Sequence, residues 1–276
     1  MPSRDAYATV PRDVILSLNN LTTHQALACA CACALSFALQ ALVHRVCSKR
    51  YPTFWRSLDA RGRADVAVRV VAGAFGIISS VWSIALLIES GRATSSVERV
   101  YAKSGTALRA RGETLFAAAC GYFVWDVVLA VVEFENYGGA LCVHAVASLA
   151  AFAVPLMMPP GFLYEFGARF LAWEITAPFL GARAIMIKAK KTDGWAFAAI
   201  ERVGFALFFV VRFVFGVPAM LTVLRDVYDF HSRGLAKPEG VYAMYAVAAL
   251  LFPLMNCLWV YKMVKVVFRG KKKKSA

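Results

Sequence analysis

Two ionisable side chains, Asp126 and His144, stand in stretches that are otherwise almost wholly apolar, "CGYFVWDVVLAVV" and "LCVHAVASL". A charged side chain in hydrocarbon costs about 2.5–3.5 kcal/mol on insertion scales, so such residues usually serve a function. A carboxylate that orients an imidazole can act as a general base. The same two groups can also hold the polar end of a lipid. Asp126 and His144 are therefore candidates for a catalytic or a lipid-binding site.

A third carboxylate, Glu174, lies in the apolar stretch "WEITAP". Pro178 has no backbone N–H and cannot donate to the carbonyl four residues earlier, which is that of Glu174. In lipid, such a carbonyl must be satisfied by protein or by water in a cavity. At 1.5 Å per residue, Asp126 lies roughly 12 Å and His144 roughly 7 Å from one membrane face. On adjacent antiparallel helices, the two side chains are predicted to reach hydrogen-bonding range.

Two arginines complete the predicted site. Arg212 is expected near the middle of the membrane, and Arg183 at the cytosolic mouth, where a guanidinium suits a phosphate or carboxylate. The predicted lipid-binding residues are Asp126, His144, Glu174, Arg183 and Arg212. The structural alternative is that Asp126 and Arg212 simply pair and lock two helices together, while His144 bonds a backbone carbonyl.

The composition is that of an integral membrane protein. Of 276 residues, 60% are hydrophobic and 17% charged, against about 45–50% and about 25% in soluble domains. The net charge of +14 comes from basic clusters beside the apolar runs, so topology and anionic lipid explain it better than nucleic acid does. The seven cysteines fall mostly in apolar runs and show no disulfide or zinc spacing. No metal or cofactor is expected.

Seven apolar runs are long enough to cross a membrane, and the expected fold class is an all-α polytopic bundle. Two connections, "ENYGG" and "MMPPG", are short and rich in turn residues, so the spans that they join should be antiparallel. The predicted spans cover about residues 25–43, 67–89, 114–134, 140–157, 161–185, 197–222 and 241–266.

The basic loops predict the orientation. They follow the first and fifth spans and form the tail "RGKKKKSA", which favours a cytosolic C-terminus. The loop after the second span is also basic, against this assignment. Lys273 and Lys274 are spaced like a signal for retrieval to the endoplasmic reticulum. Asn20 begins a glycosylation sequon on the predicted lumenal arm, close to the membrane. The expected divisions are 1–49 (lumenal arm and first span), 50–266 (membrane domain) and 267–276 (basic cytosolic tail).

The order and spacing of four segments resemble the TLC-domain family over about residues 50–266. They are "CGYFVWD", "LCVHAVASL", "WEITAPFLGAR" and "FFVVRFVFGVP". The resemblance implies helices arranged around a polar, lipid-accessible cavity, usually in the endoplasmic reticulum. Ceramide synthases of this family carry two adjacent histidines, which here fall on Val143 and His144, and paired aspartates, where Glu174 is the only carboxylate. The chain therefore looks closer to the non-synthase branch.

The expected function is to bind, sense or redistribute membrane lipid, in lipid homeostasis. The alternative is an acyl-CoA-dependent acyltransferase in which His144 alone is the base and Asp126 orients it. Less favoured are a seven-helix receptor or retinal protein and a structural role beside the translocon. Expected partners are a membrane lipid or acyl chain, with acyl-CoA under the alternative. The sequence leaves the oligomeric state open.

Overall fold

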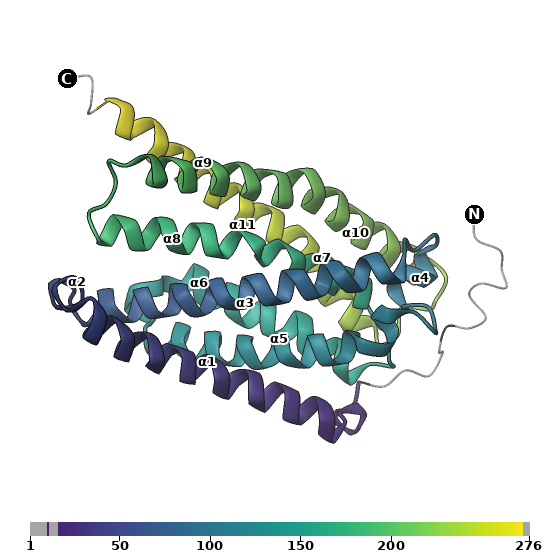
Figure 1. The fold of residues 1–276 in the computed structure, drawn as a ribbon. Helices are drawn as coiled ribbons and strands as arrows, with labels where there is room; N and C mark the ends of the chain where they lie inside the picture. The colour runs from purple at the N-terminus through teal and green to yellow at the C-terminus, as the bar shows by residue number, and fades with distance from the viewer. Residues whose placement is uncertain (1–9, 11–15, 273–276) are drawn as a thin grey trace.

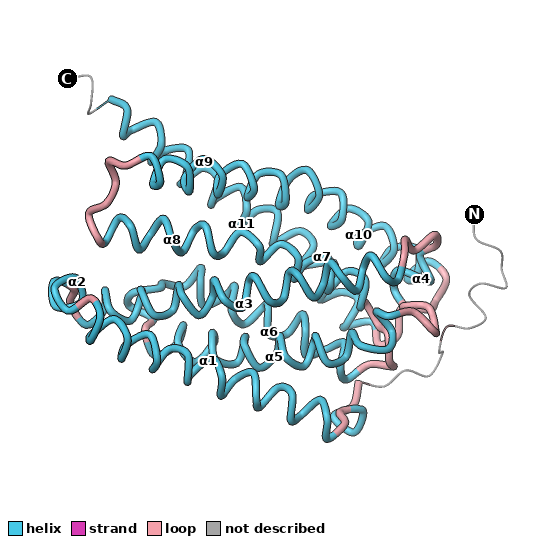
Figure 2. Tube along the Cα trace, viewed as in Figure 1, coloured by secondary structure: helices cyan, strands magenta, loops and turns pink. Residues whose placement is uncertain are grey.

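The computed structural model describes residue 10 and residues 16–272. The described residues form helices and no strand, as Figure 2 shows. The predicted dilysine, Lys273 and Lys274, lies outside them. The elements in chain order are η2 (Leu18–Asn20), α1 (Thr23–Arg50), α2 (Pro52–Ser57), α3 (Ala60–Ser90), α4 (Ser96–Val100), α5 (Ala107–Val132), α6 (Phe134–Met157), α7 (Tyr164–Ala172), η3 (Trp173–Thr176), α8 (Ala177–Lys188), α9 (Trp195–Phe209), η4 (Val210–Phe215), α10 (Gly216–Ser232) and α11 (Glu239–Lys272).

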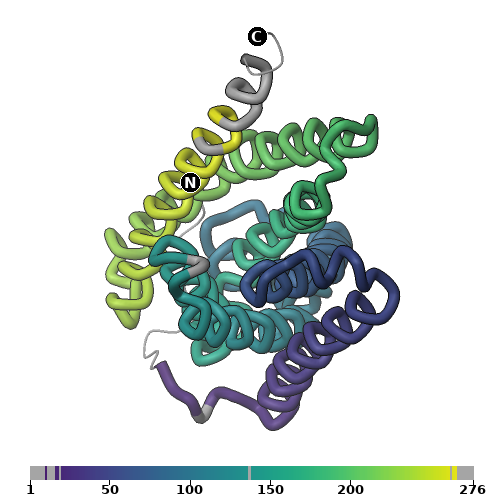
Figure 3. The backbone as a smooth tube through the Cα atoms, turned by 90° about the vertical axis from the view of Figure 1, so that its left-hand side faces the viewer, coloured from purple at the N-terminus to yellow at the C-terminus, as the bar shows by residue number. Residues whose placement is uncertain are grey.

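Seven helices of the described chain are long and apolar enough to cross a membrane, which confirms the prediction of an all-α polytopic bundle. Their connections gather at two opposite ends (Figure 1). α2, the α8–α9 connection and the C-terminal end of α11 lie at one end, and α4 and the end of α10 lie at the other. In the turned view of Figure 3, α1 lies on the opposite side of the bundle from α10 and α11.

The sixth span is much longer than predicted. The apolar run predicts residues 197–222 followed by a loop, whereas the helix runs from Trp195 to Ser232. At 1.5 Å per residue this is about 57 Å, against about 30 Å of hydrocarbon. Hydropathy marks only the part that faces lipid. The helix continues because Asp226 and Asp229 find polar partners, Arg99 and Ser96, beyond the apolar part.

The two short turns form as predicted. α5 ends at Val132 and α6 begins at Phe134, and Gly138, with a φ of 72°, interrupts α6 just after its first turn. In the second turn Gly161 has a φ of 91°, a conformation in which glycine meets no steric penalty. Leu163 donates its N–H to the carbonyl of Val100 at 2.6 Å, so this turn is tied to the α4 segment.

α5 lies at the centre of the bundle and contributes much of its core. The side chains of Phe116 and Trp125 are completely buried. The ring of Phe123 stacks on Phe152 of α6 at 5.4 Å between centroids. The Trp125 Nε1–H donates to the Gln40 side chain of α1 at 2.9 Å, which satisfies the one polar atom of this buried indole. α5 therefore fixes the positions of the helices on both sides of it.

Close packing between α3 and the α7–α8 segment depends on a glycine, Gly76. A Cβ added there would collide with the backbone carbonyl oxygen of Glu174. At Gly73, one turn earlier, an added Cβ would make ordinary contact with Pro178 Cα at 3.4 Å. Both glycines are helical, but only Gly73 has room for a methyl side chain.

We expect Gly76→Ala to lower stability by about 1–3 kcal/mol, the usual effect of overpacking, despite the helix propensity gained, about 0.5–1 kcal/mol. Gly73→Ala is the matched control and should be neutral or slightly stabilising. Thermal unfolding of both purified variants in one detergent measures the difference. Equal melting temperatures would show that α3 can move away from Glu174.

Candidate functional site

The proline in "WEITAP" ends one helix and starts another. α7 passes into the 3₁₀ turn η3, and Pro178 lies in the first turn of α8. The Ala177 N–H donates to the carbonyl of Glu174. The carbonyl predicted to be left free is therefore satisfied within the 3₁₀ turn, and no cavity water is needed for it. Ser80 of α3 donates its hydroxyl to the carbonyls of Leu171 and Ala172, at 3.2 and 3.3 Å.

Glu174 pairs with Arg212 across the bundle. The Arg212 Nη2 lies 3.4 Å from Glu174 Oε1, and Arg212 is only 7% exposed. Arg212 sits in the π-helical segment η4, just before Pro218, whose missing N–H disturbs the regular hydrogen-bond pattern there. Its guanidinium also lies 5.5 Å from the Trp173 ring centroid. Arg212 therefore pairs with Glu174, whereas the structural alternative predicted a pair with Asp126.

Asp126 and His144 do not form the predicted hydrogen bond. The Nδ1 atom of His144 is buried and has no hydrogen-bond partner among the described residues. The ring instead lies edge-on to Trp259 and Phe252 of α11, at 5.4 and 6.2 Å between centroids. Asp126 is half-buried on α5, within electrostatic range of Glu174. The prediction placed both residues by depth, but His144 points toward α11.

Arg183 does not join these residues. Its Nη2 lies 2.8 Å from Glu201 Oε1, across the pair formed by α8 and α9. The guanidinium also lies 5.8 Å from the Phe197 ring centroid. Arg183 was predicted to bind a phosphate or carboxylate at the mouth of the site, but its guanidinium already has a carboxylate partner.

The cavity beside His144, Glu174 and Arg212 is small, about 30 Å³. A water molecule needs about 10–15 Å³ measured in this way, whereas ligand pockets usually measure about 300–1,000 Å³. There is room for water and none for a lipid headgroup. The polar, lipid-sized cavity expected around these residues is not present at this place.

A larger cavity of about 740 Å³, here called the groove cavity, lies between α3 on one side and α9, η4 and α10 on the other. α7 and η3 form its floor. Trp173 lines both the groove cavity and the small cavity, so this indole separates them. The lining is mostly apolar, and its ionisable residues are Arg92, Glu165 and Arg169.

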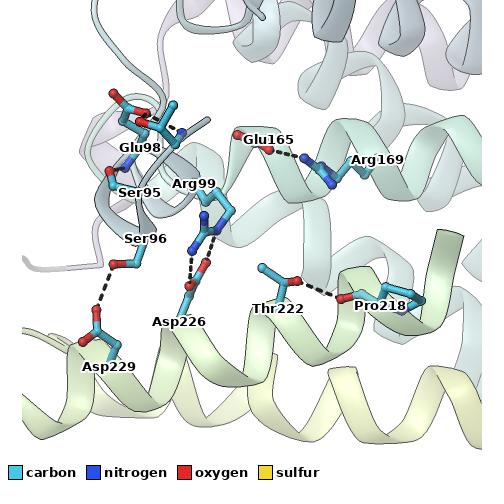
Figure 4. Close-up of polar contacts among 11 residues, drawn as sticks. Ser95, Ser96, Glu98, Arg99, Glu165, Arg169, Pro218, Thr222, Asp226 and Asp229 are labelled. Carbon is cyan, nitrogen blue, oxygen red and sulfur yellow. Dashed lines mark hydrogen bonds and ion pairs between the residues drawn. The ribbon is translucent and has the colours of Figure 1, made fainter. Parts of the chain in front are cut away.

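A polar cluster that was not predicted from the sequence lies at the α4 end of the bundle (Figure 4). Arg99 donates twice to Asp226, at 2.6 and 2.7 Å, and these hydrogen bonds raise the pKa of the Arg99 guanidinium. Arg169 pairs with Glu165 one helical turn away. The spacing of Glu165 and Arg169, four residues apart, was a usable signal. The Arg99 pair also neutralises part of the basic loop that disagreed with the predicted orientation.

The chain belongs to the TLC-domain family, whose model matches residues 65–265. It is 26% identical over 245 residues to an uncharacterised TLC domain-containing protein of Schizosaccharomyces pombe, covering 87% of this chain and 79% of that protein. It is 28% identical over 153 residues to topoisomerase I damage affected protein 4 of Saccharomyces cerevisiae, covering 54% of this chain and 53% of that protein. No solved structure matches significantly.

Proposed function

We propose that this TLC-domain protein binds a membrane lipid in the groove cavity and takes part in lipid homeostasis, by sensing or redistributing that lipid. One observation carries the proposal: an apolar cavity of about 740 Å³, within the usual range for ligand pockets, lies between membrane-spanning helices. Its rim carries exposed apolar side chains, Ile84, Ile88 and Phe215, the second of them 75% exposed. An acyl chain can enter across such a rim from the bilayer.

The predicted site residues contribute to this function through Trp173. The Arg212 guanidinium lies over the Trp173 ring, and Glu174 holds Arg212. Asp126 and His144 lie around the same pair, within electrostatic range of Glu174 and Arg212 respectively. In this proposal Glu174, Arg212, Asp126 and His144 hold Trp173 in place at the floor of the groove cavity. They do not touch a headgroup, because the small cavity beside them has room only for water.

Acyl transfer is not supported by this geometry. A general base must lie within hydrogen-bonding reach of the proton that it removes, and the His144 Nδ1 is enclosed beside a cavity of about 30 Å³. The carboxylate that would orient the ring, Asp126, is not bonded to it. The function proposed is therefore lipid binding, without a catalytic step.

The proposed location is the endoplasmic reticulum, with the C-terminus in the cytosol. The proposal is supported by basic residues from several segments at the end of the bundle that holds α2 and the α8–α9 connection, because such residues favour a cytosolic side. Replacing Lys273 and Lys274 by serine should release a tagged copy from the reticulum, as seen by imaging. Unchanged localisation would show that the two lysines act only as topology charges.

Lipid binding is tested by filling the groove cavity. Ala172 lines it, and Ala172→Phe should remove most of the lipid that copurifies with the wild-type protein in mild detergent, measured by native mass spectrometry. The matched control is Ala206→Phe, because Ala206 is exposed on α9 and lines none of the cavities described above. A wild-type protein without lipid, or equal lipid in Ala172→Phe, would refute the proposal.

A further inference from the structure

The polar groups of the groove cavity lie at one end of it. Glu165 lies in the first turn of α7, and Arg169 lies one turn after it, roughly 6 Å farther along the helix axis. Arg92 follows the C-terminal end of α3 at the same end of the bundle. Deeper walls are apolar, with Ile175 and Val211. This polarity matches a lipid whose headgroup stays near the membrane edge while its chain lies deeper.

Arg169 has a donor that its partner does not use. Its Nη2 pairs with Glu165, while its Nε–H is buried and has no hydrogen-bond partner among the described residues. A buried donor is normally paired, and an unpaired one calls for an explanation. Because the Nε atom has almost no accessible surface, a ligand in the groove cavity can accept hydrogen bonds only from the other nitrogen atoms of Arg169, whose side chain lines the cavity and is 38% exposed.

The local charge favours an anion. Glu165 balances Arg169, and Asp226 balances Arg99 through two hydrogen bonds. Arg92 is exposed and has no ion pair among the described residues. Nearby Glu89 is already paired with Arg111. Of the three ionisable residues that line the groove cavity, two are arginines and one is a glutamate, so one positive charge is left.

We propose that the ligand of the groove cavity is an acidic lipid, whose phosphate or carboxylate accepts hydrogen bonds from the guanidinium groups of Arg169 and Arg92. Guanidinium groups bind both oxyanions through charge-assisted hydrogen bonds. The inference rests on the proposed function, because it names the chemical class of the lipid bound there.

The test uses the full chain, stripped of lipid in detergent and titrated in native mass spectrometry with four probes. These are oleic acid, dioleoyl phosphatidic acid, dioleoyl phosphatidylcholine and dioleoylglycerol. At least one acid should bind about tenfold more tightly than phosphatidylcholine or dioleoylglycerol, the ratio given by one charge-assisted hydrogen bond. The acid that binds more tightly distinguishes a carboxylate ligand from a phosphate ligand.

Arg169→Lys should reduce that preference. It keeps a cation for Glu165 and so preserves folding, but it replaces the planar guanidinium, which can donate two parallel hydrogen bonds to an oxyanion, by an ammonium group. Arg92→Gln should reduce the preference further. Arg183→Gln is the control, because Arg183 is paired with Glu201 away from the cavity. Equal affinity for acidic and zwitterionic lipids, or a preference untouched by Arg169→Lys and Arg92→Gln, would overturn the inference while lipid binding itself stands. If no probe binds and Ala172→Phe changes nothing, both proposals fail.

Discussion

Replacing Glu174 by leucine is expected to destabilise the bundle by about 3–5 kcal/mol, the range for breaking one side of a buried ion pair. Arg212 would remain buried, and a guanidinium cannot lose its proton in a protein. Arg212→Leu should be less harmful, because the carboxyl group of Glu174 can take up a proton and become neutral. The order of the two effects follows from acid–base chemistry alone.

Replacing both residues removes the unpaired charge. The double variant Glu174→Leu/Arg212→Leu should therefore be more stable than Glu174→Leu, since apolar replacements of a whole buried pair are often neutral. Unfolding by denaturant in a fixed detergent gives the four values of the cycle. Additive losses would mean that the two side chains, 3.4 Å apart, do not depend on each other for stability.

The spans could be predicted from the sequence because length and composition decide them. A run of about 20 apolar residues must bury its backbone hydrogen bonds in a helix. The turns at Gly138 and Gly161 were also predictable, because glycine and proline act on the local backbone. The length of the sixth span was not, because its last turns are held by Arg99 and Ser96, which are distant in sequence.

The site was predicted only in part. The pair of Glu174 and Arg212 comes from two residues that the sequence singled out, and the structure brings them together. Asp126 and His144 failed as a pair because depth fixes only the position along a helix. The side-chain direction turns by about 100° per residue, so it depends on packing. The groove cavity lies between helices and has no signature in any one segment.

The second large effect concerns Arg99 and Asp226, which lie 127 residues apart in the chain and join α4 to α10. Asp226 is 1% exposed, so the two hydrogen bonds from Arg99 take the place of the water that a surface carboxylate would bind. Arg99→Met should cost about 1–3 kcal/mol, because a buried carboxyl group loses two hydrogen bonds. Stability of the full chain in detergent, followed by thermal unfolding, measures this loss.

The matched control is Arg233→Gln, because Arg233 donates to Asp229 on the same helix end in a more exposed pair, at 2.9 Å. Surface pairs contribute about 0–1 kcal/mol and are screened by salt. The loss from Arg99→Met should therefore persist in high salt, whereas any loss from Arg233→Gln should fade. Because Arg99 also lies within electrostatic range of Glu165 of the groove cavity, Arg99→Met should weaken binding of an acidic lipid as well. Equal, salt-sensitive losses in both variants would show that the Arg99 pair is a surface contact that leaves α4 free to move.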